Sequence, residues 1–180
     1  MAIKAILSRL PAGLSAPIVI VQHISPGFVE GFAQWLDGGT PLKVSVAAQG
    51  ETALPGHVYV APDGRHLTVG RGPVLLLVDG EPDNGLRPSV SRLFRSAAVA
   101  YGNNAAGVLL TGMGEDGAKE LKLMRDAGAV TIAQDSGSSL INGMPGAAVR
   151  AGAASFVLSP EGIAAAIAAM APAGISGGLL

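Results

Sequence analysis

A histidine and an aspartate, each placed after an apolar run, are the residues of this sequence best suited to chemistry. His23 follows residues 17–22 (PIVIVQ), and Asp116 lies in the glycine-rich segment 112–117, directly after residues 106–111 (AGVLLT). In an open parallel sheet, ligands bind at the carboxyl ends of the strands. If both runs are strands of one such sheet, the two side chains face the same edge and can meet there.

A histidine paired with an aspartate is suited to general base catalysis. An imidazole is the usual proton carrier at neutral pH. The carboxylate of Asp116 can accept a hydrogen bond from His23 and hold its tautomer, as in a Ser-His-Asp triad. Backbone N–H groups around Met113, with Gly112 and Gly114 on either side, lie close to a predicted helix N-terminus. They are candidates for stabilising an oxyanion.

Each of these residues can also have a purely structural role, and the sequence pattern alone leaves this alternative open. His23 is also typical of a partly buried histidine bonded to backbone. Asp116 is well placed to cap a helix over residues 118–127, and Met113 can be simple packing. A glycine-rich loop before a helix can also cradle a phosphate. Glu115 and Asp116 argue against that function, because they place two negative charges where an anion would dock.

The sequence lacks a convincing nucleophile to complete a triad. The elbow pattern G-x-S-x-G needs a strand before it and a helix after it. Its one literal match is residues 174–178, where no strand pattern precedes Ser176 and only two leucines follow. Ser176 is therefore a weak candidate in a predicted tail. With no Cys, and no carboxylate at ligand spacing from His57 or His66, we predict neither a metal site nor a cofactor.

Short apolar runs alternate with amphipathic segments along the chain. This alternation predicts a doubly wound α/β fold, with a mainly parallel sheet and helices on both faces in three layers. One β-hairpin is expected over residues 66–78, around the turn 70–73. The other predicted strands are 17–22, 42–47, 57–61, 106–111, 129–133 and 155–158, and the predicted helices are 2–10, 27–37, 88–101, 118–127, 145–151 and 160–171.

Length and composition limit the class of protein. The 180 residues predict one domain over 1–171 with a tail over 172–180. A hydrophobic share of 49% with 14% charged residues excludes a disordered chain. A net charge of −1 gives no basic field for nucleic acid. No apolar run reaches the roughly 20 residues that a membrane span needs, and we expect a soluble cytoplasmic protein.

The first helix is unusual because no strand precedes it. A parallel α/β domain usually opens with a strand, yet here the helix 2–10 leads directly into the strand 17–22. The pair looks like the second half of a βαβ unit. We therefore expect that an upstream strand and its turn are absent from this sequence.

Several motifs together resemble the CheB-type protein-glutamate methylesterases of bacterial chemotaxis. Residues 16–28 (APIVIVQHISPGF) are similar to the family's histidine segment. The remaining motifs follow in the family's order and with natural spacing, and the resemblance covers about residues 2–170. They are LPGHVYVAP at 54–62, RPSV with LF at 87–94, GVLLTGMGEDGA at 107–118 and GMP at 143–145.

The resemblance implies a function and a set of roles. The family hydrolyses glutamate γ-methyl esters on the cytoplasmic helices of methyl-accepting chemoreceptors, and deamidates particular receptor glutamines. It does so without a cofactor, using a Ser-His-Asp triad on a parallel α/β sheet. By motif match, His23 is the general base, Asp116 orients it, and Met113 falls at the oxyanion-hole methionine. Many members carry a phospho-accepting receiver domain upstream, which is absent from this sequence.

Two departures from the family qualify this expectation. The family's serine lies in a Gly-Ala-Ser-x-Gly-Gly turn just before the helix that here begins at Met1, so the resemblance implies an N-terminally truncated domain of doubtful activity. In addition, Ser91 stands where the family usually has an acid. Two alternatives therefore stay open: a non-catalytic receptor-binding remnant, and a phosphate or nucleotide binder that uses the loop 112–117.

Overall fold

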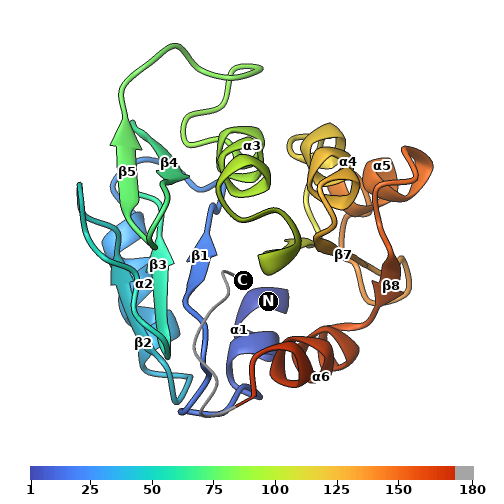
Figure 1. Ribbon diagram of the computed structural model, residues 1–180, viewed down its shortest axis with the longest axis horizontal. Coiled ribbons are helices and arrows are strands. Elements are labelled where there is room, and N and C mark those ends of the chain that lie inside the picture. The colour runs from blue at the N-terminus through green and yellow to red at the C-terminus, as the bar shows by residue number, and fades with distance from the viewer. Residues whose placement is uncertain (173–180) are drawn as a thin grey trace.

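The computed structural model describes residues 1–172, and these form helices and strands in the predicted order (Figure 1). The helices are α1 (Ala2–Leu7), α2 (Val29–Asp37), α3 (Val90–Tyr101), α4 (Ala118–Asp126), α5 (Met144–Arg150) and α6 (Pro160–Met170), with a short 3-10 turn at Gly102–Asn104. The strands are β1 (Ile18–Ile20), β2 (Lys43–Val46), β3 (His57–Val60), β4 (His66–Val69), β5 (Leu75–Val78), β6 (Ala106–Leu109), β7 (Val130–Gln134) and β8 (Phe156–Leu158).

The parallel strands fall into two separate sheets. One has the order β1-β3-β2 and the other the order β6-β7-β8, while β4 and β5 form the predicted antiparallel hairpin. The fold class is confirmed, but the described residues do not join the parallel strands into one sheet. Within residues 1–172, β1 pairs only with β3 and β6 pairs only with β7, so β1 and β6 each keep one edge unpaired.

Helices cover both faces of these sheets and enclose two apolar cores. One core lies under α3, α4 and α5 and extends to the hairpin. The other lies among α1, α2 and α6. Strand β3, sandwiched between β1 and β2, is almost fully buried at Val58, Tyr59 and Val60. A strand buried on both faces explains why its sequence is continuously apolar rather than alternating.

Close packing of α4 on β6 fixes the loop that carries Asp116. A Cβ atom at Gly107 would lie only 2.7 Å from Leu121 Cδ1 and 2.9 Å from Met124 Sδ. Glycine at this position therefore lets α4 lie directly against the strand. At the far end of α4, Gly128 has φ +91°, and this left-handed cap ends the helix as predicted.

The first helix is shorter than predicted. Its α-helical part ends at Leu7, and the amides of Arg9 and Leu10 then bond three residues back, to Ile6 and Leu7. This tighter turn leads into Pro11, which disfavours helical backbone in the residue before it. Leu10 is nevertheless buried, so the apolar periodicity continued past the end of the helix. None of the helices in residues 1–172 is both long and apolar enough to cross a membrane.

Candidate active site

His23 and Asp116 meet at the carboxyl ends of β1 and β6. His23 follows β1, and Asp116 lies in the loop between β6 and α4. The Nε2 atom of His23 is 3.0 Å from Oδ2 of Asp116, so the predicted convergence is confirmed. The Asp116 side chain is 2% exposed and that of His23 is 26% exposed. The carboxylate is thus sealed in the protein, while the imidazole reaches solvent.

The N-terminus of α3 holds the Asp116 carboxylate. Oδ2 accepts a hydrogen bond from the Val90 amide at 2.7 Å. Oδ1 accepts from the Ser91 amide at 3.1 Å, the Ser91 hydroxyl at 2.7 Å and the Ser89 hydroxyl at 3.3 Å. Helix N-termini favour anions because their first N–H groups are unpaired and the helix dipole is positive there. The alternative that Asp116 caps the next helix is wrong, because Gly117 is the N-cap of α4 and no side chain caps that end.

These contacts determine the ionisation of Asp116 and the tautomer of His23. Burial alone would raise the pKa of Asp116, but hydrogen bonds from His23, Ser91 and Val90 lower it from the ordinary 3.8 to about 2. An ionised carboxylate can only accept hydrogen bonds, so Nε2 of His23 carries the proton that it donates. The lone pair of Nδ1 is then free to accept a proton. No described residue hydrogen-bonds Nδ1.

The glycine-rich loop is fixed by its backbone. The Gly112 amide donates to Ile141 O at 3.0 Å, and Gly112 O accepts from the amides of Gly143 and Met144. The Gly112 N–H is therefore not available to an oxyanion. The amides of Met113 and Gly114 make no hydrogen bond with other described residues, so these two remain as candidate donors.

Met113 does not pack in the interior. Its side chain lies at the surface with the residue 79% exposed, so the interpretation of Met113 as simple packing is wrong. Gly117, by contrast, is enclosed: it has φ +83°, and a Cβ there would overlap Val90 Cγ1. The loop therefore presses its Asp116 end against α3 and leaves its Met113 end open.

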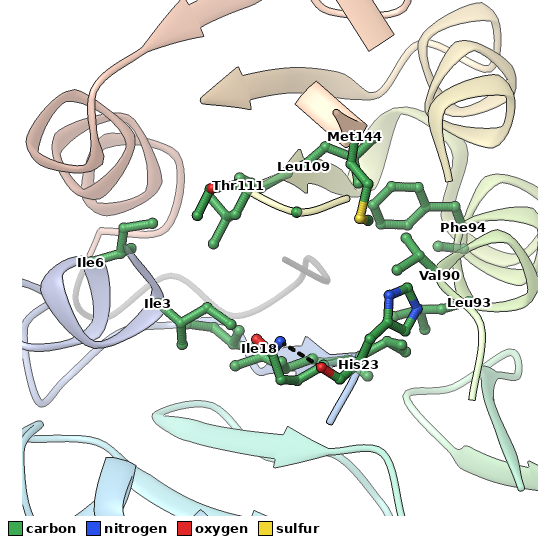
Figure 2. Close-up of a pocket in the computed structure, with 18 of the residues that line it drawn as sticks. Ile3, Ile6, Ile18, His23, Val90, Leu93, Phe94, Leu109, Thr111 and Met144 are labelled. Atoms are coloured by element: carbon green, nitrogen blue, oxygen red, sulfur yellow. Dashed lines mark hydrogen bonds between the residues drawn. The ribbon is translucent and has the colours of Figure 1, made fainter. Parts of the chain in front are cut away.

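A cavity of about 610 Å³ runs between β1 and β6, along the edges where the described part of the chain pairs no further strand. Its walls are mostly apolar side chains from α1, α3, α6 and the two strands, and His23 and Met113 line it as well. Figure 2 shows His23, Ile18 and Ile3 along one side of the cavity, with Leu109, Thr111 and Met144 opposite. The imidazole thus has a buried carboxylate on one side and an open space on the other.

Other sequence-based candidates are not brought to this site. No serine hydroxyl in residues 1–172 hydrogen-bonds His23, and Ser176 lies outside the described residues. No group of three or more His, Asp or Glu in the described part of the chain could hold a metal ion. In the loop 112–117, the Gly112 and Gly117 amides donate to Ile141 O and Ser91 Oγ. These two amides are therefore not available to a phosphate.

Sequence reasoning missed the residues that hold Asp116. The helix predicted over residues 88–101 is present as α3, and Ser89 is its N-cap, since its hydroxyl accepts from the Arg92 amide. The predicted helix could itself have indicated that a carboxylate binds at its N-terminus, because a helix N-terminus is a general anion site. Which of the carboxylates would occupy it depends on contacts between residues about 25 positions apart, and no local pattern encodes these.

Comparison with known proteins gives consistent results over nearly the whole chain. The family model described as CheB methylesterase matches residues 1–167. A protein-glutamate methylesterase/protein-glutamine glutaminase of Syntrophus aciditrophicus is 56% identical over 90% of this chain and 46% of its own length. One from Nitrosospira multiformis is 54% identical over 92% of this chain and 47% of its own length. The chain spans about half the length of these curated relatives.

A solved structure is similar as well. The crystal structure of the Thermotoga maritima CheB methylesterase catalytic domain superimposes with a TM-score of 0.90 at 36% sequence identity. The superposition covers 92% of this chain and 89% of that one. The likeness therefore extends over both three-stranded sheets and their helices.

Proposed function

The chain belongs to the CheB methylesterase family, and we propose that residues 1–171 form the catalytic domain of a protein-glutamate methylesterase that acts on chemoreceptors. The observation that carries the proposal is the 3.0 Å contact between a solvent-accessible His23 and a buried, ionised Asp116. Curated relatives that match about nine-tenths of this chain are named for this esterase activity and for glutamine deamidation. We extend both activities to this protein.

In the proposed reaction, His23 moves a proton that Asp116 helps it to hold. Nδ1 takes the proton of a nucleophilic hydroxyl as its oxygen attacks the ester carbonyl, and the imidazolium then protonates the departing methoxide to give methanol. Water, deprotonated by the same nitrogen, attacks the acyl-enzyme, and the imidazolium returns that proton to the departing hydroxyl oxygen as glutamate is released. Asp116 stabilises the imidazolium and holds its orientation. The amides of Met113 and Gly114 stabilise the negative oxygen of each tetrahedral intermediate.

The family pattern and the geometry of the cavity support a proposal for the nucleophile. We propose that a serine in a Gly-Ala-Ser-x-Gly-Gly turn is carried by a strand that lies between β1 and β6. The edges of β1 and β6 that pair with no other strand of residues 1–172 face the same apolar cavity. A strand parallel to both would end at the edge where His23 and Met113 lie. The turn after that strand would therefore deliver its hydroxyl beside Nδ1 of His23.

The test compares the chain of 180 residues with a longer polypeptide that carries such a strand and turn upstream. The substrate is a methylated cytoplasmic receptor fragment, and methanol release is measured. We expect the longer polypeptide to be active and to lose about 10²–10⁴-fold on His23→Ala. A serine-directed ester probe should label the upstream serine and not Ser176. Activity that is unchanged in His23→Ala would overturn the assignment.

The same experiment distinguishes the non-catalytic alternative. A receptor-binding remnant would bind the methylated fragment but release no methanol, even when the upstream strand and serine are present. Labelling of Ser176 in the chain of 180 residues, lost on His23→Ala, would instead replace the proposed nucleophile with a different one.

A further inference from the structure

We propose that Ser91 is a positioning residue for the Asp116–His23 pair, and that the Glu120–Arg95 ion pair directs the Ser91 hydroxyl toward Asp116. The inference rests on the proposed function, because it concerns the orientation of the proposed catalytic pair. It is carried by a set of contacts on α3 and α4 that lies behind Asp116, on the side away from His23.

The Ser91 hydroxyl lies between two carboxylates. Its Oγ is 2.7 Å from Oδ1 of Asp116 and 2.7 Å from Oε2 of Glu120. It also accepts a hydrogen bond from the Gly117 amide at 3.1 Å. A hydroxyl has a single proton, so Ser91 can donate to only one of the two carboxylates at a time. Asp116 and Glu120 therefore compete for it.

Arg95 weakens Glu120 in this competition. Its guanidinium approaches Oε1 of Glu120 at 3.2 Å and is itself held by Asp83 at 2.8 Å. Burial would lower the pKa of Arg95, but the hydrogen bonds and charges of Glu120 and Asp83 raise it, so its charge is permanent. The Glu120 carboxylate, which is ion-paired with Arg95, is a poorer hydrogen-bond acceptor than it would be without that pair. The Ser91 hydroxyl therefore donates to Asp116.

The consequence for His23 follows from the shape of a carboxylate. The two oxygens of Asp116 are fixed in one plane, so a group that holds Oδ1 also sets the direction of Oδ2. Ser91 contacts Oδ1 through both its amide and its hydroxyl, and Oδ2 receives the Val90 amide and His23. Removing the Ser91 hydroxyl leaves the carboxylate freer to turn away from Nε2.

The charged and titratable neighbours of Asp116 are few. His23 faces it from the loop after β1, and Glu120 faces it from α4 across Ser91. Arg95 reaches it only through Glu120. Glu115, next in the chain, is exposed and lies 3.8 Å from Arg150. The main determinants of the state of Asp116 are therefore His23 in front and the Ser91–Glu120–Arg95 set behind.

The experiment uses the chain of 180 residues and NMR, so it requires no ester hydrolysis. We expect Ser91→Ala to raise the pKa of Asp116 from about 2 toward its ordinary 3.8. The chemical shift of the Asp116 carboxyl carbon, recorded as a function of pH, measures this change. At neutral pH the same variant should reduce the population of the Nε2–H tautomer of His23 and speed exchange of that proton with water several-fold. Ser91→Thr, which keeps the hydroxyl, should preserve both signals.

A matched control lies five residues further along the same helix. The Ser96 hydroxyl bonds Leu93 O and the Val69 amide and has no contact with Asp116. Ser96→Ala should therefore leave the Asp116 titration and the His23 proton unchanged. If Ser91→Ala behaves like Ser96→Ala, Ser91 has only a structural role and the proposal is wrong.

A second comparison isolates the role of Arg95. Arg95→Met frees the charge of Glu120, which should draw the Ser91 hydroxyl away from Asp116 and speed His23 proton exchange. The direct loss of a positive charge is measured separately by making Arg95→Met in the Ser91→Ala background. We expect a larger effect when Ser91 is present, and equal effects in the two backgrounds would overturn the part assigned to Arg95. The Asp116 titration and the His23 proton exchange are measured without substrate, so both can be interpreted even if the enzyme is inactive.

Discussion

The two sides of His23 are built in opposite ways. Behind the imidazole, the Asp116 side chain is 2% exposed and accepts hydrogen bonds from three residues at the N-terminus of α3. In front of it lie an apolar cavity, two strand edges that pair with no other strand of residues 1–172, and the exposed Met113. The orienting half of the proposed site is therefore complete within residues 1–172, while the reacting half depends on what occupies the cavity.

This difference allows the orientation of His23 to be measured separately from catalytic activity, although the two are usually measured together. Preorganised dipoles contribute to catalysis because they need not rearrange during the reaction. The closed side has such dipoles whether or not a nucleophile is present. Substitutions on the closed side should therefore change stability and the state of His23. On the open side, stability should depend on whether the cavity is filled, and a substitution of the exposed Met113 should affect activity alone.

The largest effect is expected on filling the open side. A polypeptide extended by an apolar strand that pairs with β1 and β6 should have a clearly higher urea midpoint than the chain of 180 residues, because each buried aliphatic side chain contributes about 1.5–3 kcal/mol. An equally long extension with Pro at two strand positions is the control, since Pro cannot donate to a sheet. Equal midpoints for the strand and the Pro control would mean that the cavity does not accept a strand.

The next largest effect is expected on the closed side. Asp116→Ala leaves the Val90 and Ser91 amides buried without their acceptor, so we expect the free energy of unfolding to fall by about 3 kcal/mol. Urea unfolding at pH 7 measures it. Glu115→Ala is the neighbouring control, because the Glu115 side chain is exposed and pairs only with Arg150, and it should cost less than about 0.5 kcal/mol. Similar losses for the two variants would contradict the asymmetry.

Sequence reasoning worked best where chain direction alone decides the outcome. His23 and Asp116 each follow a strand, and parallel strands bring their carboxyl ends to one edge whatever their order. Strand order, in contrast, is not encoded in periodicity, so the facing edges of β1 and β6 were not predicted. The binding of Asp116 by α3 also escaped prediction, because Ser89 and Ser91 are distant from it in sequence and local spacing was equally compatible with a cap on α4.

A smaller effect concerns acid. The pKa of Asp116 is lowered on folding, from the ordinary 3.8 to about 2, so its contribution is fully present above about pH 4 and is lost as the pH falls through about 2. The contribution amounts to about 2 kcal/mol at neutral pH. Urea midpoints between pH 5 and 2 should therefore fall more steeply in the parent chain than in Asp116→Asn. Parallel curves for the two chains would show that this carboxylate does not contribute.

The smallest effect on stability is expected at the open end of the loop 112–117. Met113 is 79% exposed, so Met113→Ala removes almost no buried surface and should change the free energy of unfolding by less than about 0.5 kcal/mol. Its amide, which we propose as an oxyanion donor, is unaltered by the substitution. In the extended, active polypeptide a loss of methanol release without loss of stability would mean that the side chain itself contacts the receptor helix or shields the oxyanion. A loss of stability comparable to that of Asp116→Ala would show that the two ends of the loop are not as different as their exposure indicates.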